Sequence, residues 1–126
     1  MHSIGIDIGS TSAKVAIIEA SSGEIKELFL LPTGWSSADT AMLIKERVLA
    51  LGLGELYFVA TGYGRVSVPY ANKTLTEITC HALGAHYFCK SDCTVIDVGG
   101  QDTKAIKLEN GSVTDFTMND KCSAGT

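Results

Sequence analysis

The amino-acid sequence predicts an α/β fold, in which a β-β-β-α-β-α segment is followed by a second β-β-β segment. Two short stretches with the same order of residues, Ile6–Gly9 and Ile96–Gly99, each end an apolar run with an acid and a glycine. Between them apolar residues recur at helical spacing, and after the second stretch they alternate around an Asn-Gly turn. A chain of 126 residues, 45% of them hydrophobic, is long enough to bury a core in such a fold.

Four strands are predicted in the first part of the chain, at residues 3–8, 13–20, 24–31 and 55–61. Gly9–Ser12 joins the first two strands, and a short turn ending at Gly23 precedes the third. So short a connection favours antiparallel pairing of the second and third strands.

The first helix is predicted between the third and fourth strands. Ala41, Ile44, Val48 and Leu51 step along the chain by the spacing of one helical face. A serine start and Gly52 after the last apolar residue are typical helix boundaries.

The second helix is predicted to begin near Thr74. Thr74 and Glu77 fit a capping box, and this cap explains Glu77 more simply than the alternative of an acid that orients water. The predicted apolar face contains Leu75, Ile78, Ala82 and Ala85.

The last part of the chain starts the three-strand pattern again. Strands are predicted at residues 93–99, 103–109 and 112–118, with a hairpin turn at Asn110-Gly111. Ile6–Gly9 and Ile96–Gly99 then occupy equivalent places ninety residues apart, and Lys14 matches Lys104 at the same offset. The sequence therefore predicts an internal repeat.

The turn after the first strand has the composition of an anion site. Gly9 lets the backbone approach a ligand because it has no Cβ, and turn hydroxyls and N–H groups form concave anion sites. An acid beside phosphates repels them unless a cation lies between, and Mg²⁺ bridges carboxylates to phosphates. Asp7 is therefore predicted to bind magnesium and to take part in catalysis. The predicted phosphate-binding residues are Gly9, Ser10, Thr11, Ser12 and Lys14.

The second turn offers a similar set after Asp97. Asp97 or Gln101 is predicted to orient an attacking water, because phosphoryl transfer needs mainly positioning and charge neutralisation. Gly99, Gly100 and Asp102 are the predicted cofactor-binding residues of this turn. One Asp-x-Gly turn alone is common in hairpins without function. The pair, at equivalent places in a repeat, favours a clamp for a nucleotide polyphosphate.

Composition narrows the classes of partner. A net charge of −4 without a basic block argues against binding nucleic acid or an anionic membrane by bulk charge. The chain has no apolar stretch of membrane-spanning length, and a strand within two residues of the start argues against a signal peptide. With four cysteines and no secretion signal, we expect a cytoplasmic protein whose thiols are free or bind metal.

Five blocks carry a resemblance to a known family: "GIDIGSTSAK", "ATGYGR" (60–65), "EITCHALGA" (77–85), "VIDVGGQDTK" (95–104) and "MNDKCSAGT" (118–126). The chain resembles the ATPase activators of 2-hydroxyacyl-CoA dehydratases and the ATPase subunits of benzoyl-CoA reductases. These belong to the superfamily of acetate kinases, sugar kinases, Hsp70 and actin. The resemblance covers the whole chain and implies only the N-terminal part of such a protein.

The resemblance implies a ribonuclease H-like, actin-type ATPase lobe at residues 1–91 and an incomplete second lobe at residues 92–126. It also implies that ATP hydrolysis drives one electron from an iron–sulfur cluster to an acyl-CoA dehydratase or reductase. One cysteine cannot hold a [4Fe-4S] cluster, which needs four thiolates. In the resembled family two subunits share the cluster across a homodimer, and Cys122 matches one of the ligands.

Two other functions stay open from the sequence. A sugar- or acetate-kinase-like phosphotransferase shares the hairpins but has no use for Cys122. A non-catalytic nucleotide-binding or assembly fragment is the other, and it predicts neither ATP turnover nor a cluster. Residues near the site also have simple alternatives: Arg65 is either a phosphate ligand or a solvated loop residue, and Trp35 is expected to cover the core.

Overall fold

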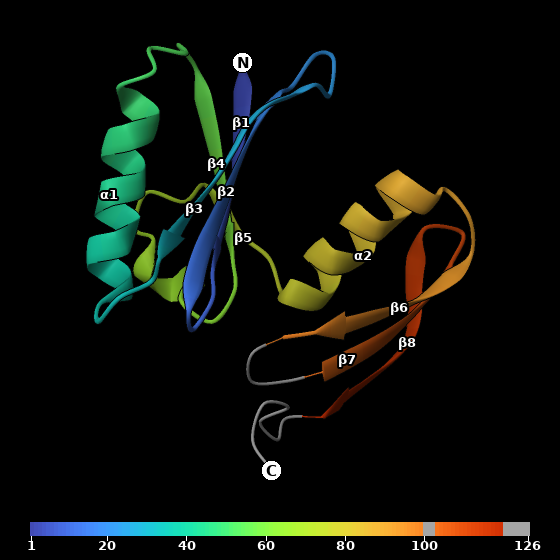
Figure 1. The fold of residues 1–126 in the computed structure, drawn as a ribbon. Coiled ribbons are helices and arrows are strands. Elements are labelled where there is room, and N and C mark those ends of the chain that lie inside the picture. The colour runs from blue at the N-terminus through green and yellow to red at the C-terminus, as the bar shows by residue number, and fades with distance from the viewer. Residues whose placement is uncertain (100–102, 120–126) are drawn as a thin grey trace. The chain divides into compact units, whose positions relative to one another are not determined.

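The computed structural model describes residues 1–99 and 103–119 of the chain. These fall into two compact units, Met1–Leu75 and Thr76–Thr126, which are described separately (Figure 1). Within the described ranges, neither α-helix combines the length and the apolar character needed to cross a bilayer.

The first unit is built on a mixed sheet with the strand order β3-β2-β1-β4-β5. Its strands are β1 (His2–Ile8), β2 (Ser12–Glu19), β3 (Ile25–Pro32), β4 (Leu56–Thr61) and β5 (Lys73–Thr74). β2 pairs antiparallel with β3, as the short turn predicts, and also with β1, whereas β4 pairs parallel with β1 and with β5. Alternate residues of β1 point into the core, so that Ile4, Ile6 and Ile8 are fully buried.

Helix α1 (Ser37–Leu49) lies against this sheet (Figure 1). The side chain of Ser36 caps it by accepting a hydrogen bond from the N–H of Asp39. Ala41, Ile44 and Val48 are buried as predicted. Leu51, which was expected on the same face, comes after the last helical residue and is exposed.

The second unit packs helix α2 (Glu77–Cys89) on one face of an antiparallel sheet with the order β6-β7-β8 (Figure 1). The strands are β6 (Cys93–Val98), β7 (Thr103–Glu109) and β8 (Ser112–Asn119). Its buried core is small and contains Ala82 of α2 with Ile106 and Leu108 of β7. The Asn110-Gly111 turn joins β7 to β8, and both residues have positive φ, which is typical of such hairpins.

The start of α2 differs from the prediction. Thr74 lies in β5, where it pairs with Ala60 of β4. The N–H of Leu75 donates to the carbonyl of Ala60. Thr76 caps the helix instead, and its side chain accepts a hydrogen bond from the N–H of Thr79. The predicted Thr74–Glu77 capping box is therefore wrong, because pairing with a distant strand takes up Thr74.

Three more features were not anticipated. The two-residue strand β5 and a 3₁₀ turn at Arg65–Ser67 both follow β4, and neither is predicted by apolar spacing. Trp35, expected to cover the core, is fully exposed beside Gly34, which has positive φ.

The two meanders share one register. Asp7 pairs with Lys14 across β1 and β2, and Asp97 pairs with Lys104 across β6 and β7. The register of the second pair of strands shifts between Ile17 and Ile18 in the first unit and between Lys107 and Leu108 in the second, again ninety residues apart. The predicted repeat is therefore confirmed down to the position of an irregularity. The compact units divide at Leu75 and Thr76, so that α2 belongs to the same unit as β6–β8. The predicted lobe boundary between residues 91 and 92 stays a prediction.

Candidate functional site

The first hairpin turn is closed by its own backbone. The N–H of Gly9 donates to the carbonyl of Ser12 over 3.0 Å, and Ser10 and Thr11 are exposed at the tip. A Cβ added at Gly9 would lie 3.1 Å from that carbonyl oxygen and 3.3 Å from Lys14 Nζ. A side chain at this position would press on the backbone of the turn and on the end of the lysine, which favours glycine.

Asp7 and Lys14 form the charged pair of this hairpin. Their side chains lie next to each other across β1 and β2, with Lys14 Nζ 3.6 Å from Asp7 Oδ2. The Lys14 side chain is half exposed and that of Asp7 is about one quarter exposed. Both groups are therefore accessible to a ligand, and the lysine is held by a weak, solvated contact.

Thr33 supports the turn from below and was not anticipated from the sequence. Its hydroxyl donates to the carbonyl of Gly9 over 2.8 Å, and its N–H donates to the carbonyl of Thr11. Thr40 of α1 in turn donates its hydroxyl to the carbonyl of Thr33. Both threonines are buried, so α1 is linked to the turn through hydrogen bonds. The feature of the sequence that could have indicated this contact is a threonine directly after Pro32, the last residue of β3.

The loop after β4 passes directly against Asp7. Gly62 has φ +90°, and a Cβ added there would overlap Asp7 Oδ1 and lie 2.5 Å from the carbonyl oxygen of Ile8. The N–H of Gly64 donates to the same carbonyl. Arg65 donates from Nη1 to the carbonyl of Gly62, which favours a loop-holding role over a free phosphate ligand. The sequence signal for this contact was the pair of glycines in "TGYG".

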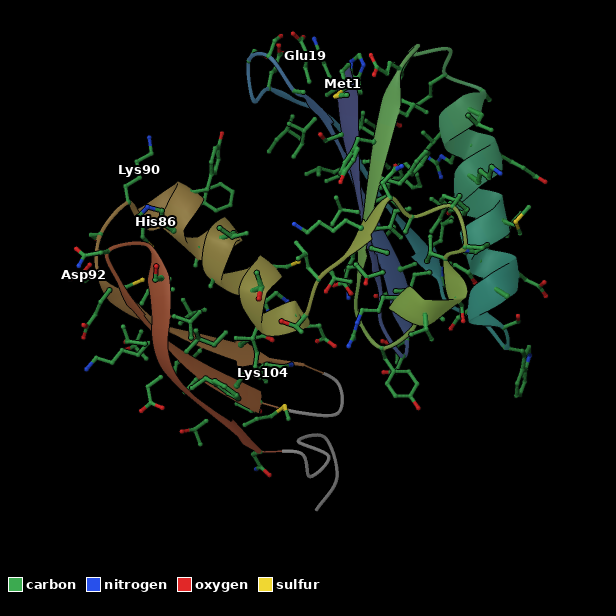
Figure 2. The ribbon with its side chains drawn as sticks, turned by 180° about the vertical axis from the view of Figure 1, so that it is seen from behind. Met1, Glu19, His86, Lys90, Asp92 and Lys104 are labelled. Atoms are coloured by element: carbon green, nitrogen blue, oxygen red, sulfur yellow. The ribbon has the colours of Figure 1, made fainter. Side chains whose placement is uncertain are left out.

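The second hairpin places its acid in a more crowded set of charges. Lys104 Nζ lies 3.6 Å from Asp97 Oδ2, the same distance as in the first hairpin, and it also donates to Glu77 Oε2 over 3.3 Å. His81 Nδ1 lies 3.0 Å from the same Asp97 oxygen. Lys104 is only 4% exposed and lies on the face of the sheet that α2 covers (Figure 2). Glu77 therefore pairs with a buried cation and does not cap the helix.

Part of the predicted site lies outside the described residues. Gly99 follows the last residue of β6. Gly100, Gln101, Asp102 and Cys122 lie outside the described residues. Within residues 1–99 and 103–119, no group of three or more histidine, cysteine or acidic side chains has the arrangement of a metal site.

The described cysteines are free thiols with different exposure. Cys89 at the end of α2 is exposed, and Cys93 at the start of β6 packs against the core of the second unit. Burial raises the pKa of the Cys93 thiol, and the nearby Cys89 adds to this rise. The Cys93 thiol is therefore a poor source of thiolate.

The first hairpin fits a magnesium-bound phosphate by the chemistry of its groups. A carboxylate, Asp7, is accessible at the end of β1, and carboxylates are ligands that Mg²⁺ prefers. Gly9 keeps the backbone clear of a side chain, and the turn next to it presents two exposed hydroxyl residues. Lys14 supplies a cation beside them.

Comparison with known proteins finds relatives along the whole chain. The uncharacterized protein YjiL of Escherichia coli (strain K12) is 46% identical over 99% of this chain and 49% of its own length. The (R)-2-hydroxyglutaryl-CoA dehydratase activating ATPase of Acidaminococcus fermentans is 41% identical over 100% of this chain and 50% of its own length. The chain thus spans about half the length of these relatives.

Solved structures agree with the fold. The activator of the 2-hydroxyisocaproyl-CoA dehydratase from Clostridium difficile with bound ADPNP matches with a TM-score of 0.83 and 35% identity. This match covers 98% of the present chain and 47% of that protein. The predicted fold class, an actin-type ATPase lobe followed by the first strands of a second, is confirmed. The family model described as the BadF/BadG/BcrA/BcrD ATPase family matches residues 4–126, and the chain belongs to this family.

Proposed function

We propose that this chain is the N-terminal part of an ATP-hydrolysing activator that drives low-potential electron transfer to an acyl-CoA dehydratase or reductase. The observation that carries the proposal is the repeated Asp–Lys hairpin, with the same register and the same 3.6 Å contact in both copies. Membership of an ATPase family and a relative solved with bound ADPNP support nucleotide binding.

The nucleotide-binding roles follow from the two turns. Gly9, Ser10, Thr11, Ser12 and Lys14 hold phosphate oxygens from the first turn, and Gly99, Gly100 and Asp102 do so from the second. Asp7 holds Mg²⁺, which neutralises phosphate charge when it is bound. Asp97 and Gln101 orient the attacking water.

The electron-transfer half of the proposal rests on Cys122. We assign it as one ligand of a [4Fe-4S] cluster shared across a homodimer, because a single thiolate per chain cannot complete the cluster. The neighbouring Lys121 favours the thiolate form that ligates iron. The named activators among the relatives support an acyl-CoA dehydratase as the partner. Such a partner fits a cytoplasmic protein of anaerobic metabolism. We propose no binding to nucleic acid or to a membrane.

The decisive experiment compares two variants of the full-length protein, purified without oxygen. Asp7→Asn is expected to lower ATP turnover at least tenfold while iron content stays normal, because it removes a carboxylate from the proposed magnesium site. Cys122→Ser is expected to remove the iron but keep nucleotide binding. Iron analysis, ADPNP titration and phosphate release measure the three outcomes.

Each half of the proposal has its own contrary result. Normal turnover in Asp7→Asn contradicts the magnesium role, and unchanged iron in Cys122→Ser removes this residue from the ligand set. A wild-type protein that transfers phosphate to a small acceptor and binds no iron would favour the kinase-like alternative. The 126-residue chain alone is expected to show negligible ATP turnover, since it spans only about half of its relatives.

A further inference from the structure

Helix α2 presents two polar side chains to the second hairpin that the proposed function does not use. Glu77 and His81 are four residues apart, so they lie on the same face of the helix. Glu77 contacts Lys104, and His81 contacts Asp97. Lys104 and Asp97 are the acid–lysine pair of the second hairpin. In the first unit the hydrogen bonds that link the hairpin turn to α1 run instead through the uncharged side chains of Thr33 and Thr40. The charged face of α2 is therefore an addition specific to the second unit.

The two contacts to Asp97 are made to the same carboxylate oxygen. The contact of His81 Nδ1, at 3.0 Å, and that of Lys104 Nζ, at 3.6 Å, are both made to Oδ2. A carboxylate held by two groups on one oxygen has a fixed orientation, and its other oxygen can face a water or a metal. Lys104 in turn is kept in place by Glu77 over 3.3 Å.

His81 Nδ1 is buried and has no hydrogen bond of good geometry within the described residues, although it lies 3.0 Å from the Asp97 carboxylate. A buried polar nitrogen needs a partner, and Asp97 Oδ2 is the acceptor within reach. A small rotation of the imidazole ring is enough to align this bond. The ring is thus suited to respond when Asp97 takes up a ligand.

We propose that His81 and Glu77 are positioning residues for Asp97: they fix the carboxylate through Oδ2, directly and through Lys104, so that Oδ1 faces the reacting water. This inference rests on the proposed ATP hydrolysis and adds two residues to its machinery. Glu77 thereby keeps a role in orienting water, but acts through Lys104 and Asp97.

The test measures kcat and KM for ATP in the full-length protein. His81→Ala is expected to lower kcat about 10- to 100-fold, the usual effect of removing an orienting partner. KM should change less than about threefold, because ground-state binding of the nucleotide is kept. His81→Asn should restore kcat to within about fivefold of wild type, since its amide nitrogen can take the place of Nδ1. Glu77→Gln should lower kcat by about tenfold.

His86→Ala is the matched control. His86 lies on the same helix, its Nδ1 is also buried without a hydrogen bond among the described residues, and it packs against Gly111 in the β7–β8 turn (Figure 2). Among the described residues, no ion pair links His86 to Asp97 or to Glu77. Its loss should reduce thermal stability as much as the loss of His81, yet leave kcat within twofold of wild type.

A second readout does not depend on turnover. The imidazole nitrogen signals of the three histidines can be observed by NMR in this chain. Asp97→Asn should shift the Nδ1 signal of His81, whereas Asp7→Asn should leave it unchanged. An unshifted His81 signal in Asp97→Asn overturns the contact on which the inference is built.

The two hypotheses fail in different ways. A wild-type protein that neither binds ADPNP nor hydrolyses ATP overturns the proposed function, and the inference falls with it. A wild-type protein that hydrolyses ATP, while His81→Ala keeps its kcat within twofold, overturns the inference alone. A parallel loss of kcat in His81→Ala and His86→Ala, without rescue by His81→Asn, shows a structural role and also overturns it.

Discussion

The two hairpins of this protein have the same register and the same acid–lysine contact, but their lysines lie in opposite environments. Lys14 is half exposed and contacts the carboxylate of Asp7, whereas Lys104 is 4% exposed and contacts the carboxylates of both Glu77 and Asp97. A buried lysine with two carboxylates is a fixed structural cation, while a half-exposed one can move to an incoming anion. The repeat has therefore kept the geometry of the acid–lysine pair and changed the environment of its lysine.

The acids of the hairpins are also supported by different means. Asp7 lies against the backbone of the loop after β4, where Gly62 leaves no room for a side chain. Asp97 is held by charged and polar groups, Lys104 on β7 and His81 on α2. The support of Asp7 by the loop depends on shape, and the support of Asp97 depends on charge. Different substitutions should therefore disrupt the two supports.

The largest effect is expected from Gly62→Ala. A residue with a side chain at φ +90° costs about 1–3 kcal/mol of strain, and forcing a Cβ toward the carbonyl of Ile8 adds about 1–3 kcal/mol of overpacking. We therefore expect a loss of about 4 kcal/mol in the free energy of unfolding of the first unit. Urea denaturation followed by circular dichroism measures it.

Gly84→Ala is the control for this change. Gly84 lies inside α2, and nothing lies within 4 Å of an added Cβ. The same substitution there should stabilise the protein by about 0.5–1 kcal/mol, because alanine is the better helix former. A Gly62→Ala protein within 1 kcal/mol of wild type would show that the loop can move away from Asp7 at little cost.

The next largest effect is expected from Lys104→Met. Removing the cation leaves the carboxylates of Glu77 and Asp97 without the lysine that they share, and breaking a buried pair costs about 3–5 kcal/mol. Because the two carboxylates are about one third exposed, we expect the lower end, about 3 kcal/mol. The midpoint of urea unfolding, at unchanged slope, reports this loss.

Lys107→Met, on the same strand, separates burial from charge. Lys107 is largely exposed and contacts only Glu109 at 3.2 Å among the described residues. Its loss should change stability by less than about 0.5 kcal/mol, as is usual for a surface ion pair. Equal effects of the two lysine substitutions would contradict the assignment of Lys104 as a fixed buried cation.

The sequence was sufficient where the structure depends on local signals. The isoleucines of β1, the face of α1 and the Asn-Gly turn were all readable from spacing and turn chemistry. The repeat of Asp7 and Asp97 was readable as well, and the shared register confirms it. These features are decided by residues close together in the chain.

The sequence was insufficient where the structure depends on distant partners. The start of α2 was misplaced because β4 pairs with Thr74, and Glu77 was read as a cap because Lys104 is 27 residues away. The supporting contacts of Thr33 and Gly62 were missed for the same reason. Burial is a tertiary property, so identical Asp–Lys spacing could not show that one lysine is exposed and the other enclosed.

A small effect on stability, but the sharpest test of the comparison, is expected from Lys14→Met. The half-exposed pair with Asp7 contributes less than about 1 kcal/mol, so the unfolding midpoint should hardly move. Affinity of the full-length protein for ADPNP should nevertheless fall about tenfold, because a solvated cation next to Gly9 is lost from the phosphate site. Raising the salt concentration should weaken wild-type binding more than that of the variant, since salt screens exposed charges. Lys104→Met should show the reverse order, with a large loss of stability and no change in salt dependence. If Lys14→Met unfolds as readily as Lys104→Met, or binds ADPNP as wild type does, the two lysines have not diverged in function.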